Sequence, residues 1–189
     1  MKSLILETST ESALLAVVNG NELLAHIHLE GGPELSKSLG LEIKKITELS
    51  PPPFHRIIIG CGPGSYTGIR VGAAMAQALA FGWKIPLYSV SSLSGFAPKT
   101  NKNFVVIVDA RSGGMFIQEN FNAPKLLKLP EAEAILRTAE IIASPHPDRI
   151  ATRIAGLTQL VKTYPDPLHL ALHAWRSETP DLSYLSSPG

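Results

Sequence analysis

The sequence predicts an α/β fold in which a mixed β-sheet with flanking helices is followed by a reduced second lobe. Three short apolar runs open the chain, an amphipathic segment follows them, and strand and helix patterns then alternate. Strands first and alternating elements afterwards are typical of a mixed sheet with parallel crossovers. With 189 residues, the chain is long enough to bury one sizeable core with an appended sub-lobe.

The first part of the chain predicts an antiparallel meander and one helix. The three apolar runs cover residues 3–7, 13–18 and 22–29, and Asn19-Gly20-Asn21 between the last two is a strong hairpin signal. From residue 33 to residue 49, apolar side chains recur at helical spacing, which predicts an amphipathic helix. Its apolar positions are Leu35, Leu39, Ile43 and Ile46.

The middle of the chain predicts a parallel crossover and two further strands. Residues 56–60 are a β-branched run behind three prolines, and residues 67–82 are rich in alanine and free of proline, so we expect a buried strand and then a helix. Strands are also expected at 85–89, 105–108 and 115–120. Three antiparallel strands followed by helix, strand, helix and strand is the core order of the actin, hexokinase and Hsp70 type of fold, which is ribonuclease H-like.

A glycine-rich turn from Gly60 to Gly68 leads into the predicted helix. Backbone N–H groups at such a helix start allow close approach of an anion or of a partner's backbone. The spacing excludes a P-loop, which needs a lysine that is absent here, and also a dinucleotide fingerprint, whose third glycine is replaced by Ser65 or Thr67. Ser65 also lacks the flanking glycines of a nucleophile elbow. A tight connection without a ligand remains an alternative.

The helix after this turn carries small residues at every fourth position, namely Gly68, Gly72, Ala76 and Ala80. Such a smooth stripe lets another helix approach closely. The alternative is a tight internal contact of the same face against the sheet. The spacing leaves both open.

Two loops hold phosphates in folds of the actin and hexokinase type. The first is residues 7–10 here, whose hydroxyls could cup an anion while Glu7 holds a hydrated Mg²⁺. The second follows the strand at 105–108, where Asp109 precedes Arg111. A structural role is the alternative in both loops. In the first loop the hydroxyls could satisfy turn amides, and in the second Asp109 could pair with Arg111. The candidate anion or nucleotide contacts are Thr8, Ser9, Gly62, Gly64, Ser65 and Thr67.

A small-molecule phosphotransferase using Glu7 and Asp109 with Mg-ATP is therefore the alternative function. Against it stand the missing lysine or arginine clamp near the turn and the short chain after Phe121. A peptidase lacks both a nucleophile system and a metal constellation in this sequence.

A histidine pair near the C-terminus, His169 and His173, has the spacing that places two imidazoles on one helical face. No acidic residue lies between them and no third ligand is evident. Packing is therefore favoured over a metal site, and we expect no metal and no catalytic residue.

Composition narrows the class of protein further. The formal net charge is +1 and no basic run exceeds Lys44-Lys45, which disfavours direct tRNA binding by this chain. The single Cys61 excludes an internal disulfide. Glu7 interrupts the apolar start of the chain, and no apolar run approaches the ~20 residues of a membrane span. These features predict a cytoplasmic protein without a membrane partner.

The segment Gly62-Pro63-Gly64-Ser65-Tyr66-Thr67-Gly68-Ile69-Arg70-Val71-Gly72 closely resembles the signature of the bacterial TsaB family, also called YeaZ. Residues 6–10, 85–93 and 108–111 agree with that family in order and spacing. The resemblance implies an N-terminal domain of the actin and Hsp70 (ASKHA) type over residues 1–121. Residues 122–189 would form a shortened, divergent C-terminal lobe with a tail.

The resemblance implies a non-catalytic subunit needed for N6-threonylcarbamoyladenosine (t6A) at position 37 of tRNA. In that family TsaB is the dimerisation platform for the catalytic subunit TsaD, and TsaE joins through the complex. A homodimer is expected when the chain is alone, and ATP or ADP could bind at a shared interface. TsaB proteins pair through the helices that correspond to residues 34–49 and 67–82. The expected interface residues are Leu35, Leu39, Gly68, Arg70, Gly72, Ala76 and Ala80.

Overall fold

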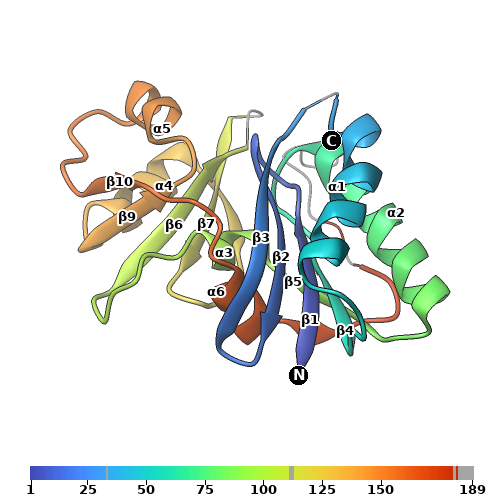
Figure 1. Cartoon of the computed structure of the whole chain (residues 1–189). Coiled ribbons are helices and arrows are strands. Elements are labelled where there is room, and N and C mark those ends of the chain that lie inside the picture. The colour runs from blue at the N-terminus through green and yellow to red at the C-terminus, as the bar shows by residue number, and fades with distance from the viewer. Residues whose placement is uncertain (33, 111–112, 181, 183–189) are drawn as a thin grey trace.

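The computed structural model describes residues 1–32, 34–110, 113–180 and 182. Two sheets lie side by side and are flanked by helices (Figure 1). The first sheet has six strands in the order β11-β5-β4-β1-β2-β3, and the second has five in the order β10-β9-β6-β7-β8. None of the helices within these ranges has the length and apolar character needed to cross a bilayer.

The first sheet confirms the predicted meander and crossover. β1 pairs antiparallel with β2, and β2 with β3, while β4 lies parallel to both β1 and β5. Its strands are β1 (Lys2–Glu7), β2 (Ser12–Asn19), β3 (Glu22–Glu30), β4 (Arg56–Gly60), β5 (Leu87–Val90) and β11 (Trp175–Arg176).

Both faces of this sheet are covered. Leu4 and Leu6 of β1 face the core shared with α1 (Leu35–Leu49) and α2 (Tyr66–Trp83). Ile5, between them, faces α6 (Pro167–Leu172) on the other side. Alternate side chains of one strand therefore enter two cores, which explains why β1 is a continuous apolar run.

The second sheet is built from β6 (Phe104–Asp109), β7 (Gly114–Glu119), β8 (Lys125–Lys128), β9 (Ile141–Ser144) and β10 (Leu160–Lys162). On its outer face pack α4 (Leu129–Leu136) and α5 (Pro147–Arg153). On its inner face, Leu93 and Phe96 at the short helix α3 (Ser92–Gly95) pack against Val106 of β6. Gly95 of α3 lies against Leu170 of α6, so this cluster meets the helix that covers one face of the first sheet.

The predicted domain boundary at residue 121 falls inside the second sheet. β6 and β7 precede it, yet they pair with β9 and β8, which follow it. The chain then returns to the first sheet through α6 and β11. A strand pattern in the sequence identifies a strand but not the strands with which it pairs. For this reason the residues of β6 and β7 were expected in the first domain.

The stripe of small residues on α2 faces the sheet of its own chain. A Cβ placed on Gly68 would lie 2.1 Å from the carbonyl oxygen of Thr8, and one on Gly72 would lie 2.1 Å from Thr8 Oγ1. Further along the same face of α2, Ala76 and Ala80 lie in the core together with Leu35 and Leu39 of α1. These six residues, which were expected to contact a partner, are buried within this one chain. Arg70 is exposed on the outer side of α2.

Candidate functional site

A cavity of about 230 Å³ lies where the hairpin turn after β1, the glycine turn before α2, the end of β6 and the start of α5 meet. Hydroxyl, acidic and basic side chains line it. The lining residues are Ser9, Thr10, Glu11, Gly32, Gly64, Ser65, Val108, Asp109, His146 and Arg149. This cavity brings together parts of both sheets.

Glu7 does not reach this cavity. It is fully buried at the end of β1, where its Oε1 accepts a hydrogen bond of 2.7 Å from the backbone N–H of Ser9. Burial raises the pKa of Glu7 above its ordinary value, although hydrogen bonds from Ser9 and Ser92 oppose the rise. The carboxyl group lies beside Gly60, which has no Cβ to exclude it.

The glycine turn is fixed by backbone hydrogen bonds. The N–H of Ser65 donates to the carbonyl of Ser9 at 2.7 Å, and a Cβ on Gly64 would lie 2.3 Å from that same carbonyl oxygen. Gly62 exchanges two hydrogen bonds with Ser92, since its N–H donates to Ser92 Oγ and its carbonyl accepts from the Ser92 N–H. Ser65 Oγ then caps α2 by accepting from Gly68 N–H at 3.3 Å.

Three of the six predicted anion contacts therefore line the cavity, namely Ser9, Gly64 and Ser65. Thr8 lies beneath α2 instead, and Gly62 is held inside the turn by Ser92. Thr67 is exposed at the start of α2 and is not part of the cavity wall. The turn predicted from the sequence thus forms one side of the site, while Thr8, Gly62 and Thr67 do not line it.

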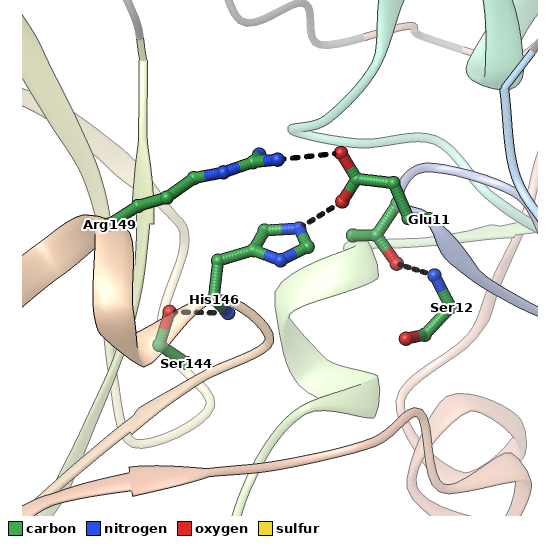
Figure 2. A network of polar contacts seen from close by, with 6 residues as sticks. Glu11, Ser12, Ser144, His146 and Arg149 are labelled. Carbon is green, nitrogen blue, oxygen red and sulfur yellow. Dashed lines mark hydrogen bonds and ion pairs between the residues drawn. The ribbon is translucent and has the colours of Figure 1, made fainter.

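The ion pairs that Glu11 forms across the site were not predicted. Glu11 forms ion pairs with His146 at 2.7 Å and with Arg149 at 2.9 Å (Figure 2). Arg149 follows Glu11 by 138 positions, and neither belongs to a recognisable motif. Without knowledge of which segments meet, no sequence signal could have found this contact.

Asp109 lines the cavity and is bound by Arg153 of α5. Its predicted neighbour Arg111 lies outside the described residues. The cavity wall includes Asp109 but not Glu7, so the two carboxylates of the phosphotransferase alternative are not presented together. Over the residues that the structure describes, no group of three or more His, Cys, Asp or Glu side chains is arranged to hold a metal.

The two histidines of α6 pack on an aromatic ring. His173 stacks on Phe121 with ring centroids 3.8 Å apart, and His169 meets the same ring edge-on at 5.5 Å. Burial, together with the neighbouring His169, lowers the pKa of His173. This arrangement agrees with the predicted packing role.

The paired sheets, with a hairpin turn and a glycine turn meeting between them, have the actin and hexokinase (ASKHA) type of fold, as predicted. The model of the family described as "TsaD: tRNA N6-adenosine threonylcarbamoyltransferase" matches residues 37–174. This match covers β4 and β5 of the first sheet and all five strands of the second. The chain therefore belongs to this family.

Curated relatives agree with this assignment. The chain is 32% identical over 131 residues to the tRNA threonylcarbamoyladenosine biosynthesis protein TsaB of Haemophilus influenzae, covering 61% of this chain and 52% of the relative. It is 31% identical over 126 residues to TsaB of Escherichia coli, covering 63% and 54%. The chain thus spans about half the length of the curated relatives it matches.

Solved structures show the same fold. YeaZ from Pseudomonas aeruginosa superposes with a TM-score of 0.70 at 17% identity, over 90% of this chain and 88% of that one. The ethanolamine utilization protein EutJ from Carboxydothermus hydrogenoformans gives 0.51 at 11% identity, over 92% and 90%. At these identities the similarity is one of fold.

Proposed function

We propose that the chain is a non-catalytic, TsaB-like subunit that supports t6A formation on tRNA by pairing with TsaD. Family membership over residues 37–174 and relatives described as TsaB support this role. TsaE would join through the complex, and the chain would pair with a second copy when TsaD is absent. The proposed setting is the cytoplasm, where tRNA is modified.

The observation that carries the proposal is a set of exposed apolar side chains on α1 and α2, the two helices that cover one side of the first sheet (Figure 1). Phe81 of α2 is 87% exposed and Leu41 of α1 is 65% exposed. Large apolar side chains on the outer face of a helix are typical of protein interfaces. Arg70 is also exposed on α2, and arginine is enriched in protein interfaces.

The docking surface is therefore assigned to the outer faces of α1 and α2, with Leu41, Arg70 and Phe81 as its main contacts. The inner faces, which the resemblance to the TsaB family implied as the interface, are occupied by the core of this chain. A partner that meets α2 would touch exposed Ala74 and Gln77 rather than Gly72 and Ala76.

A non-catalytic role agrees with the state of the two candidate carboxylates. Glu7 is buried beside Gly60, and Asp109 is bound by Arg153. A phosphotransferase would need both groups free to approach Mg-ATP in the cavity. We therefore do not propose the phosphotransferase.

The experiment mixes the purified chain with TsaD and measures complex formation and transfer of the threonylcarbamoyl group to tRNA. Both should depend on this chain and fall at least tenfold for Phe81→Glu, because a charge would be buried at the contact. Leu172→Glu is the matched control, since Leu172 is 71% exposed on α6, which covers the opposite face of the sheet. Full transfer in the absence of this chain would refute the proposed role.

A further inference from the structure

Glu11 connects the two halves of the cavity wall through both of its carboxylate oxygens. Oε2 accepts from Nε2 of His146 at 2.7 Å, and Oε1 accepts from Nη2 of Arg149 at 2.9 Å (Figure 2). Glu11 comes from the turn between β1 and β2, whereas both basic residues come from the start of α5. A carboxylate of one sheet is thus held by a cationic pair, His146 and Arg149, that belongs to the other.

The backbone around each partner is fixed. The N–H of Gly31 donates to the carbonyl of Glu11 at 2.9 Å, and a Cβ on Gly31 would lie 2.8 Å from the Glu11 Cα. On the other side, Ser144 Oγ accepts from the backbone N–H of His146 at 3.1 Å (Figure 2). These contacts do not involve the ion pair, so the backbone on both sides of it is fixed without the Glu11 carboxylate.

The carboxylate that fills this site is ionised. Partial burial raises its pKa, but the hydrogen bond from Arg149 and the charges of His146 and Arg149 outweigh burial, so the pKa of Glu11 is lowered overall. An anion is therefore what the cationic pair binds in this structure. Arginine pairs equally well with carboxylate and phosphate oxygens, since both present two acceptors to its planar fork.

The rest of the cavity suits a small phosphate group. Ser9, Thr10 and Ser65 contribute hydroxyl-bearing residues to the wall, and the other acid, Asp109, is bound by Arg153. The cavity measures about 230 Å³, and one water takes about 30 Å³ in the liquid. It therefore has room for an anion the size of pyrophosphate.

We propose that Glu11 is a built-in competitor that occupies an anion site formed by His146 and Arg149, and that this site binds a phosphate or pyrophosphate group once the carboxylate is removed. The inference is independent of pairing with TsaD. In the wild-type chain the Glu11 carboxylate is tethered beside the cationic pair and has a high effective concentration there. It would therefore exclude phosphate-bearing molecules from the cavity.

The test is a calorimetric titration of inorganic pyrophosphate into the wild-type chain and into three variants at one fixed salt concentration, since anion affinity depends on salt. Glu11→Gln keeps the shape of the side chain and removes its charge. Glu11→Gln combined with Arg149→Gln also removes the main cation. Glu30→Gln is the charge-matched control, because Glu30 is exposed on β3 and is not part of this cavity wall.

Glu11→Gln should bind pyrophosphate at least tenfold more tightly than the wild-type chain, and the double variant should lose that gain. The inference is overturned if Glu11→Gln binds no tighter than the wild type, if the double variant binds as tightly as Glu11→Gln, or if Glu30→Gln shows the same gain. Glu11→Ser is titrated in parallel, so that the result does not depend on the folding of one variant.

Discussion

The carboxyl group of Glu7 occupies the space that a side chain on Gly60 would fill. A Cβ built on Gly60 would lie 1.8 Å from Glu7 Oε2 and 2.8 Å from Ser92 Oγ. Glu7 ends β1 and Gly60 ends β4, and the two strands are parallel neighbours. The first glycine of the turn is therefore required by a buried acid of the adjacent strand, rather than by a ligand.

Gly60→Ala should destabilise the chain by about 2–3 kcal/mol, because a methyl group would be forced into a packed site that Glu7 cannot leave. Urea unfolding followed by circular dichroism measures the change. Combining Gly60→Ala with Glu7→Asp, which shortens the acid, should recover at least half of the loss. Wild-type stability of Gly60→Ala would show that the carboxyl group does not occupy this space.

Glu7→Gln should change how the free energy of unfolding depends on pH. Burial raises the pKa of Glu7 in the folded chain above its ordinary value of 4.5, so the folded state retains a proton that the unfolded state releases. Wild-type stability should therefore fall as pH rises from 4.5 through the folded pKa. Glutamine cannot ionise, so the variant should gain stability relative to the wild type across this window. Parallel stability curves for the two chains would contradict this.

Glu11→Gln should have the opposite effect on how the free energy of unfolding depends on pH. Partial burial raises the pKa of Glu11, but Arg149 and His146 lower it overall, so the unfolded state takes up the proton first as pH falls. The contribution of the ion pairs is full above the ordinary value of 4.5 and is lost as pH falls through the folded pKa. Because these side chains are partly exposed, the effect should be about 0.5–1 kcal/mol and should shrink in high salt.

The measurement for Glu11→Gln is chemical unfolding at a series of pH values in low and high salt. The variant should lack the loss of stability that the wild-type chain shows in acid. Glu30→Gln again serves as control, since the acid it removes lies outside the cavity wall. An acid limb that is unchanged in Glu11→Gln would mean that the ion pairs do not form in solution.

Local patterns predicted the elements of the fold, because each depends on neighbouring residues. Asn19-Gly20-Asn21 marked the hairpin between β2 and β3, and the spacing of Leu35, Leu39, Ile43 and Ile46 placed α1. Contacts between distant segments could not be predicted in this way. The neighbour of Gly72 is Thr8, and the neighbour of Glu11 is Arg149. A smooth helix face has the same spacing of small residues whether it meets its own sheet or a partner, so only the structure shows in which direction that face points.

That direction can be tested with two glycines of α2. A Cβ on Gly72 would lie 2.1 Å from Thr8 Oγ1 and 3.1 Å from Ile59 Cδ1, whereas a Cβ on Gly82 meets no atom within 4 Å. Gly72→Ala should therefore destabilise the chain by about 1–3 kcal/mol. Gly82→Ala should leave stability unchanged or raise it by less than about 1 kcal/mol, because alanine is the better helix former.

Thermal and urea unfolding of both variants measure these effects, with binding to TsaD followed in parallel. Adding Thr8→Ala to Gly72→Ala removes the hydroxyl in the way and should restore part of the stability. If the small-residue stripe met a partner instead of the sheet, Gly72→Ala would weaken the complex with TsaD while leaving the isolated chain as stable as the wild type. A loss of stability that Thr8→Ala partly reverses would tie the stripe to the turn after β1, which leaves the outer face of α2 available for the partner.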